Sequence, residues 1–165
     1  MKSQTRQRPD GRPRIIALGE GMLELSRRPD GTAELAFGGD TLNTALYLAR
    51  LGQDVAYATA LGRDAWSDDL RFNWAAEGLD LRLVLEHPDR LPGLYAITTD
   101  AAGERSFSYW RESSAAREFF RLEGAAAAIE AMGQADLFYV TGISLSLFPP
   151  EDRETIHAIA RAVRA

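Results

Sequence analysis

Hydrophobic residues along the chain form short runs and spaced patterns that predict alternating strands and helices. Residues 15–19 form a brief apolar run closed by glycine, which is typical of a strand buried on both faces of a parallel sheet. Residues 41–51 carry apolar side chains at helical spacing before a glycine stop. A second buried strand over 55–61 and a second helix over 67–77 follow. This alternation predicts an α/β fold built on a doubly wound, mostly parallel sheet.

Two segments depart from this strand–helix alternation, because their apolar and polar residues alternate one by one. Residues 22–26 and 33–37 flank Pro29-Asp30-Gly31, and residues 94–99 and 105–111 flank a polar linker that contains Gly103. Alternation around turn residues predicts β-hairpins with one solvated face. We therefore expect a small second sheet, with strands near 22–37 and 94–111.

The rest of the chain returns to the α/β pattern. Residues 124–132 are rich in alanine and predict a helix, residues 137–140 predict a buried strand, and a final helix begins at Pro149-Pro150 and extends to residue 165. We expect one partial domain over 15–165, which ends on a helix with no closing strand after it.

Charge and composition exclude several classes of protein. The 165 residues carry a formal net charge of -5, and the only lysine is Lys2, so a P-loop lysine is excluded. The first fourteen residues hold five basic side chains and one acidic one, which leaves -9 on the remainder. We expect residues 1–14 to be a disordered basic tail, without the apolar region of a secretory signal. An acidic body does not favour nucleic-acid binding.

Other composition features narrow the chemistry. No apolar run reaches the roughly 18 residues of a membrane helix, so we expect no membrane span. Since residues 1–14 do not resemble a secretory signal, we expect a cytoplasmic protein. The chain has no cysteine, which excludes thiolate metal sites and a cysteine nucleophile. His87 and His157 stand far apart, which argues against a histidine metal site.

The segment from Gly38 to Asn43 is the strongest candidate for ligand binding. Two glycines allow a ligand to approach the backbone, and the helix that follows offers free N–H groups at its start. Asp40 and Asn43 add hydrogen-bonding groups that suit a polyol. The alternative interpretation is an ordinary turn in which Asp40 only caps the helix. Glu20, just past the first strand, lies where open α/β sheets bind ligands, unless it is a solvated loop residue.

The second hairpin offers a different set of groups. Tyr109 and Arg111 share a face of their strand by the two-residue period, and Tyr95 lies on the partner strand. An arginine in this position could bind a carboxylate through two parallel hydrogen bonds. The alternative is an aromatic strand packed on a core, with an arginine that extends to solvent.

Taken together, an ordered set of short motifs resembles the amino-terminal half of a ribokinase-like (PfkB) sugar kinase. The set comprises Gly19-Glu20-Gly21-Met22, Gly38-Gly39-Asp40-Thr41-Leu42-Asn43-Thr44-Ala45, Leu51-Gly52, Thr59-Ala60-Leu61-Gly62-Arg63-Asp64, Ala76-Glu77-Gly78-Leu79-Asp80 and Thr141-Gly142-Ile143-Ser144. Within that family the chain is most similar to the 2-keto-3-deoxygluconate kinases. The segments that carry this finer resemblance are Asp40-Thr41-Leu42-Asn43, Arg90-Leu91-Pro92-Gly93-Leu94-Tyr95 and Tyr109-Trp110-Arg111.

The resemblance implies a fold, a reaction and a set of site residues. It implies a doubly wound domain with a small β-sheet lid, and phosphorylation of a sugar hydroxyl that depends on ATP and Mg²⁺. Tyr109 and Arg111 would recognise the acid end of a keto-deoxy sugar acid, and Tyr95 would contact the sugar from the lid. The residues that would line the sugar site by motif are Gly39, Asp40, Thr41, Leu42 and Asn43.

The resemblance also implies that important parts lie outside this sequence. Members of the family are about twice as long, and their second half carries the Gly-Ala-Gly-Asp segment, the catalytic aspartate and the nucleotide pocket. We expect this chain to hold the sugar-binding half and to be inactive alone. The alternatives are a fructokinase-like or other sugar kinase, a non-catalytic sugar-acid-binding or interaction module, and a truncated product. A homo-oligomer formed through the lid is a further expectation.

Overall fold

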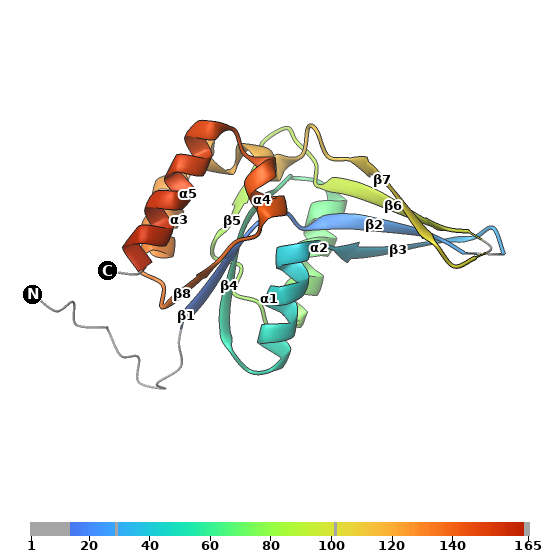
Figure 1. Ribbon diagram of the computed structural model, residues 1–165, viewed down its shortest axis with the longest axis horizontal. Coiled ribbons are helices and arrows are strands. Elements are labelled where there is room, and N and C mark those ends of the chain that lie inside the picture. The colour runs from blue at the N-terminus through green and yellow to red at the C-terminus, as the bar shows by residue number, and fades with distance from the viewer. Residues whose placement is uncertain (1–13, 29, 101, 164–165) are drawn as a thin grey trace, which may run out of the picture.

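The protein forms two β-sheets that meet at one end of each (Figure 1). The structure is a computed structural model that describes residues 14–28, 30–100 and 102–163. The parallel sheet has the order β5 (Val84–Glu86), β4 (Asp54–Leu61), β1 (Arg14–Leu18), β8 (Leu137–Tyr139). The mixed sheet has the order β3 (Ala33–Gly38), β2 (Met22–Arg27), β6 (Gly93–Thr99), β7 (Arg105–Trp110).

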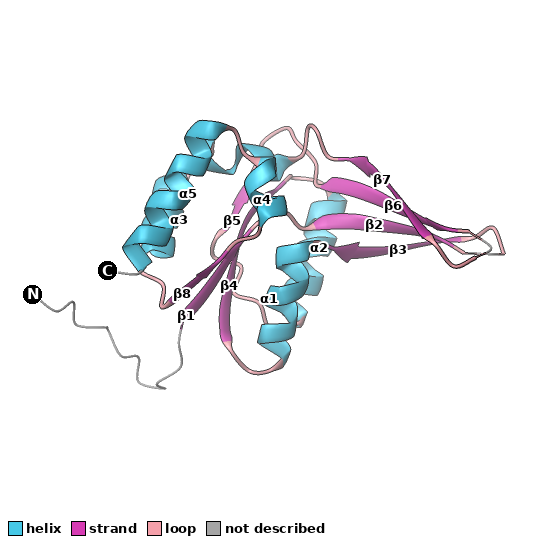
Figure 2. Cartoon of the chain, in the orientation of Figure 1, coloured by secondary structure: helices cyan, strands magenta, loops and turns pink. Residues whose placement is uncertain are grey.

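Helices cover both faces of the parallel sheet, as a doubly wound fold requires (Figure 2). One face packs against α1 (Asp40–Arg50) and α2 (Ala65–Ala76). The other packs against η1 (Ala115–Arg121), α3 (Ala125–Gly133) and α5 (Pro150–Val163), while the short α4 (Gly142–Leu147) follows β8. None of the helices within the described residues is both long and apolar enough to cross a membrane.

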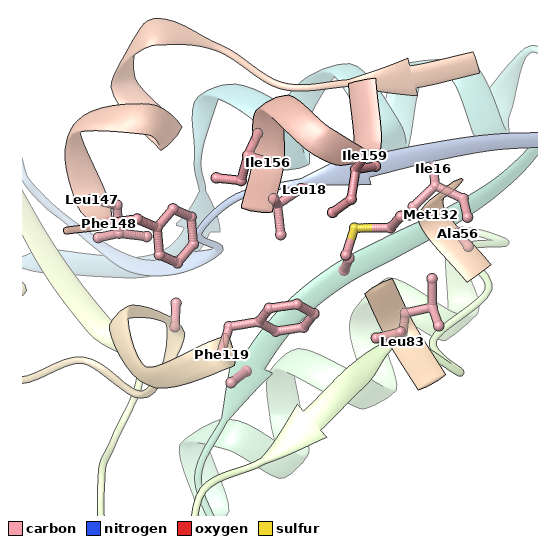
Figure 3. Close-up of a cluster of buried hydrophobic side chains, with 14 of the residues drawn as sticks. Ile16, Leu18, Ala56, Leu83, Phe119, Met132, Leu147, Phe148, Ile156 and Ile159 are labelled. Carbon is pink, nitrogen blue, oxygen red and sulfur yellow. The ribbon is translucent and has the colours of Figure 1, made fainter. Parts of the chain in front are cut away.

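The side chains of β1 and β4 alternate between two hydrophobic cores. Ile16 and Leu18 point into the core with η1, α3 and α5, where Phe119 and Met132 are fully buried (Figure 3). Ile15 and Ala17 point to the opposite face, toward α1 and α2. A two-residue period therefore explains why both strands are apolar at nearly every position.

The core beneath α1 and α2 centres on an aromatic pair. Trp74 of α2 and Tyr57 of β4 are both fully buried and meet edge to face, with ring centroids 5.5 Å apart. Leu42 and Leu46, one turn apart on α1, pack in the same core. The apolar spacing of the sequence thus fixes which side of α1 faces the sheet.

The mixed sheet joins the two predicted hairpins into one layer. Strands β2 and β3 pair antiparallel, and so do β6 and β7, whereas β2 and β6 pair in parallel from Met22 opposite Gly93. The hairpin predictions are confirmed, and the β2–β6 pairing is a long-range contact that local patterns do not encode. Large apolar side chains remain exposed on this sheet, namely Leu35, Phe107, Tyr109 and Trp110.

Several sequence predictions need correction. The segment 137–140 was expected to be buried, but β8 lies at the sheet edge and Leu137 is 45% exposed. The three-residue strand β5 and the short helices η1 and α4 were not predicted. Helix α2 begins at Ala65 because Asp64, just before it, accepts a hydrogen bond from the Ser67 backbone N–H. The chain before residue 14, predicted to be a basic tail, lies outside the described residues.

The strand order places a topological switch point between β1 and β8. The chain leaves β1 toward β4 on one side, and β8 later pairs with β1 on the other side. Segments that follow these two strands therefore diverge and leave a crevice at their carboxyl ends, where open α/β sheets bind ligands.

Candidate functional site

A cavity of about 180 Å³ opens at this switch point, between the carboxyl ends of β1 and β8 and the mixed sheet. It brings together residues that are up to 124 positions apart in the sequence. Seven of the nine predicted site residues line it: Glu20, Gly39, Asp40, Asn43, Tyr95, Tyr109 and Arg111. Its wall also contains Met22, Phe107, Ile143 and Ser144.

Gly39 allows α1 to begin directly beside Glu20. Its φ of 152° and ψ of 142° lie in a region that only glycine adopts readily. A Cβ on Gly39 would lie 2.3 Å from the backbone oxygen of Glu20, so the two segments touch through their backbones. The first backbone bond of α1, from Asn43 N–H to the Gly39 carbonyl, is 2.8 Å long. Asp40 and Asn43 consequently occupy the first helical turn at the cavity wall.

Asp40 is held by a residue from the other end of the chain. The Thr141 hydroxyl donates a hydrogen bond to Oδ2 of Asp40. The same hydroxyl oxygen accepts a hydrogen bond from the Ser144 backbone N–H at 3.2 Å, which caps α4. This arrangement fixes the Asp40 carboxylate at the cavity and connects α1 to the segment that follows β8.

Arg111 and Glu20 form a buried ion pair at the floor of the cavity. Glu20 Oε2 lies 2.5 Å from Arg111 Nη2, and the two side chains are 2% and 18% exposed. Neither carboxylate oxygen of Glu20 receives a well-directed hydrogen bond from the described residues. Burial raises the pKa of Glu20 above 4.5, although the nearby Arg111 charge acts in the opposite direction.

Aromatic side chains form the side of the cavity that belongs to the mixed sheet. The rings of Tyr95, Phe107 and Tyr109 stack in a tilted cluster with centroids 6.0–6.4 Å apart. Tyr95 is nearly buried, and its hydroxyl donates to the Glu24 carboxylate, so it faces the cavity chiefly with its ring. Burial, together with the Glu24 hydrogen bond, raises the pKa of Tyr95. Tyr109 is 54% exposed.

Thr41 and Leu42, also predicted to line the sugar site, point elsewhere. Both are fully buried and absent from the cavity wall. The Thr41 hydroxyl lies 3.2 Å from the Tyr57 hydroxyl and fills the space beside Gly19, where a Cβ would lie 2.0 Å from Thr41 Oγ1. The helical period explains this, because positions 41 and 42 face the sheet while 40 and 43 flank them on the open side.

The sequence reasoning missed two kinds of residue. Ile143 and Ser144 line the cavity from α4, and Thr141 positions Asp40, yet the Thr141–Ser144 motif was given no role. These residues follow a strand of the parallel sheet, and that position could have been used to predict that they line a ligand cavity. Glu24, which holds the Tyr95 hydroxyl, follows the alternation of its strand and carried no separate signal.

The described residues do not gather a cluster of metal-ligating side chains. Across 14–28, 30–100 and 102–163, no three His, Cys, Asp or Glu side chains gather in a way that could hold a metal. The residues that line the cavity instead offer hydroxyl-binding groups and one guanidinium. They fit a small polar ligand better than a metal–triphosphate complex.

Comparison with known proteins gives a consistent result. The 2-dehydro-3-deoxygluconokinase of Escherichia coli K12 is 41% identical over 156 residues, which cover 92% of this chain and 50% of that protein. The fold matches the 2-dehydro-3-deoxygluconokinase of Thermotoga maritima with a TM-score of 0.76 at 21% identity, covering 92% of this chain and 48% of that one. A fructokinase from Xylella fastidiosa, solved with bound ATP, gives 0.75 at 25% identity, covering 92% and 45%.

The chain therefore spans about half the length of the curated relatives that it matches. Residues 13–165 match the model of the pfkB family of carbohydrate kinases, a range that includes every residue of the cavity wall. The chain belongs to the pfkB carbohydrate kinase family.

Proposed function

We propose that this chain supplies the sugar-acid-binding side of a kinase that phosphorylates 2-keto-3-deoxygluconate with ATP and Mg²⁺. The observation that carries the proposal is the cavity itself, whose wall combines a largely buried guanidinium with a helix start that carries Asp40 and Asn43. A sugar acid has a carboxylate for the first and hydroxyl groups for the second. The 41% identity to 2-dehydro-3-deoxygluconokinases supports the same substrate.

In this proposal each part of the cavity has a distinct task. Arg111 binds the ligand carboxylate, and Asp40, fixed by Thr141, accepts hydrogen bonds from sugar hydroxyls, with Asn43 beside it. The rings of Tyr95 and Tyr109 cover the ligand and exclude water, which strengthens the polar contacts. Bound ATP–Mg²⁺ would supply the phosphoryl group. The resemblance to the family implies that the nucleotide site and the catalytic aspartate belong to the second half of relatives of which this chain spans about half, so we expect residues 1–165 alone to transfer no phosphate.

Calorimetric titration without nucleotide tests the proposal. The purified chain should bind 2-keto-3-deoxygluconate, and Arg111→Ala should weaken that binding by about 2 kcal/mol, or roughly 30-fold. Arg105→Ala is the matched control, because Arg105 is an exposed arginine at the start of β7, the strand that ends just before Arg111, and lies outside the cavity wall. Equal affinity of the wild type, Arg111→Ala and Arg105→Ala for the acid would contradict the proposal.

The same titration separates the alternatives. A fructokinase-like protein would bind fructose more tightly than the sugar acid and would be insensitive to Arg111→Ala. A non-catalytic module would bind the acid. It would transfer no phosphate to the acid even when the second half of a family kinase is supplied together with ATP and Mg²⁺. A truncated product without a stable fold would show no cooperative thermal unfolding.

We also propose a homo-oligomer formed through the mixed sheet. Phe107 and Tyr109 on one face of β7 and Trp110 on the other are 48%, 54% and 62% exposed, which is much apolar area for a solvated strand. Light scattering after size exclusion would give the mass directly. A monomer mass at micromolar concentration would reject this part of the proposal.

A further inference from the structure

Arg111 is not a vacant anion site, because Glu20 already occupies part of it. The two groups are in contact at 2.5 Å, and Glu20 is almost inaccessible to solvent, with a side chain 2% exposed. A ligand carboxylate that reaches the guanidinium must therefore either displace Glu20 or lie beside it.

The surroundings of Glu20 oppose its displacement from Arg111. A Cβ on Gly93 would lie 2.7 Å from Glu20 Oε1, so the strand β6 packs closely against the carboxylate from one side. The backbone oxygen of Glu20 is in turn in contact with Gly39 at the start of α1. Close packing at both the main chain and the carboxylate restricts how far Glu20 can move away from Arg111.

The charges around Glu20 cannot neutralise a second carboxylate. The cations that face it are Arg111 and, farther away on η1, Arg117. Asp40 adds another carboxylate at the same cavity, and Glu24 lies farther along the same face of β2 as Met22, bonded to Tyr95. The remaining titratable neighbours are phenols, Tyr57, Tyr95 and Tyr109, and those of Tyr57 and Tyr95 are held in the neutral form because burial raises their pKa.

We infer that Glu20 takes up a proton when a sugar acid binds, so that a neutral Glu20 remains beside an Arg111–carboxylate pair. This inference rests on the proposed function. The balance is simple: the Glu20 carboxylate accepts H⁺ from solvent, the ligand carboxylate replaces it as the counter-ion of Arg111, and no covalent bond other than O–H changes. Two carboxylates that share one buried cation cannot both remain ionised without a large electrostatic cost.

Proton uptake makes acid affinity depend on pH and makes Glu20 a determinant of specificity. Burial already raises the pKa of Glu20, and the charge of the ligand raises it further in the complex. Between those two pKa values, each unit of pH increase weakens acid binding up to tenfold, because one proton enters with the ligand. A neutral sugar brings no charge and takes up no proton. Glu20 thus sets how strongly the cavity prefers acids at a given pH.

Calorimetry in two buffers measures the protons directly. At one pH, titration of wild-type protein with 2-keto-3-deoxygluconate in phosphate and in Tris should give heats whose difference corresponds to as much as one proton taken up per ligand. Glu20→Gln should remove both the uptake and the pH dependence of the dissociation constant. Glu34→Gln, at an exposed glutamate of β3 that pairs only with Arg28 among the described residues, is the matched control and should behave as the wild type.

The outcomes separate this inference from the proposed function. Binding of the acid with no proton uptake and with a dissociation constant that is constant from pH 5 to pH 8 overturns the inference and leaves the proposed function standing. Failure of both the wild type and Glu20→Gln to bind the acid overturns both. If Glu20→Gln does not fold, two measurements on the wild type still test the inference. These are the proton uptake from the two buffers and the pH dependence of the dissociation constant.

Discussion

Gly39 is the position where a single methyl group should do the most damage to the site. Its backbone has φ 152° and ψ 142°, a combination that costs residues other than glycine about 1–3 kcal/mol. The added Cβ would also lie 2.3 Å from the backbone oxygen of Glu20, and neither partner is a flexible side chain. Relief of that contact requires α1 to move away from the end of β1.

The backbone strain and the close contact with Glu20 together should lower the free energy of unfolding of Gly39→Ala by about 3 kcal/mol or more. In a chain of this length, 1 kcal/mol lowers the melting temperature by about 2–4 °C, so the expected fall is about 6–12 °C. Gly78→Ala is the matched control. Gly78 has φ 89°, but a Cβ there would meet no atom within 4 Å, so it reports backbone strain alone, at about 1 kcal/mol.

Thermal unfolding followed by circular dichroism provides the assay, with urea denaturation to give the free energy of unfolding. Calorimetry on the same samples would show whether the loss of stability is accompanied by a loss of sugar-acid binding. If Gly39→Ala and Gly78→Ala lower the melting temperature equally, the backbone contact between Gly39 and Glu20 contributes nothing and the reasoning is refuted.

Three more changes have expected outcomes. Trp74→Ala should destabilise the fold by about 3–5 kcal/mol in urea, because it empties a fully buried position; a loss below 1 kcal/mol would contradict this. Thr141→Val should weaken sugar-acid binding about tenfold in calorimetry, since it removes the donor to Asp40, while Thr141→Ser should retain it. Burial alone would raise the pKa of Asp80, but hydrogen bonds and charge from Arg82 together hold it below 3.8. Asp80 therefore stabilises the fold above pH 4, and that contribution is lost as pH falls through its folded pKa. Asp80→Asn should lower stability at pH 7 by about 1 kcal/mol and flatten this acid dependence, and an unchanged profile would argue against the pair.

The sequence predicts best those elements whose own apolar spacing determines their structure. The strand at 15–19 and the helix at 41–51 are confirmed with small shifts at their ends, because apolar spacing determines which side of each element is buried. Both hairpins are confirmed for the same reason. The segment 137–140, expected to be a buried strand, is an edge strand. The order of strands depends on the pairing of the whole sheet and cannot be predicted from the pattern of four residues.

In the candidate site, too, the sequence predicts features that depend on neighbouring residues and fails to predict contacts between distant segments. Asp40 and Asn43 line the cavity, but the neighbouring Thr41 and Leu42 are buried, because a helix turns by 100° at each of the consecutive residues that make up the motif. The Arg111 position was predicted from its strand period. Its pairing with Glu20, 91 residues earlier, depends on the parallel β2–β6 contact and could not be predicted locally.

The residues of the cavity wall come from the end of β1 and from β2, α1, β6, β7 and α4, so the cavity exists only when segments from residue 20 to residue 144 are folded together. A ligand that binds there selects the native state over every partly unfolded one, and at a hundred times its dissociation constant it adds about 2.7 kcal/mol to the free energy of unfolding. Candidate sugars and sugar acids can therefore be ranked by the rise in melting temperature that each produces. Such a ranking needs neither ATP nor turnover, and it would identify the substrate class from this chain alone.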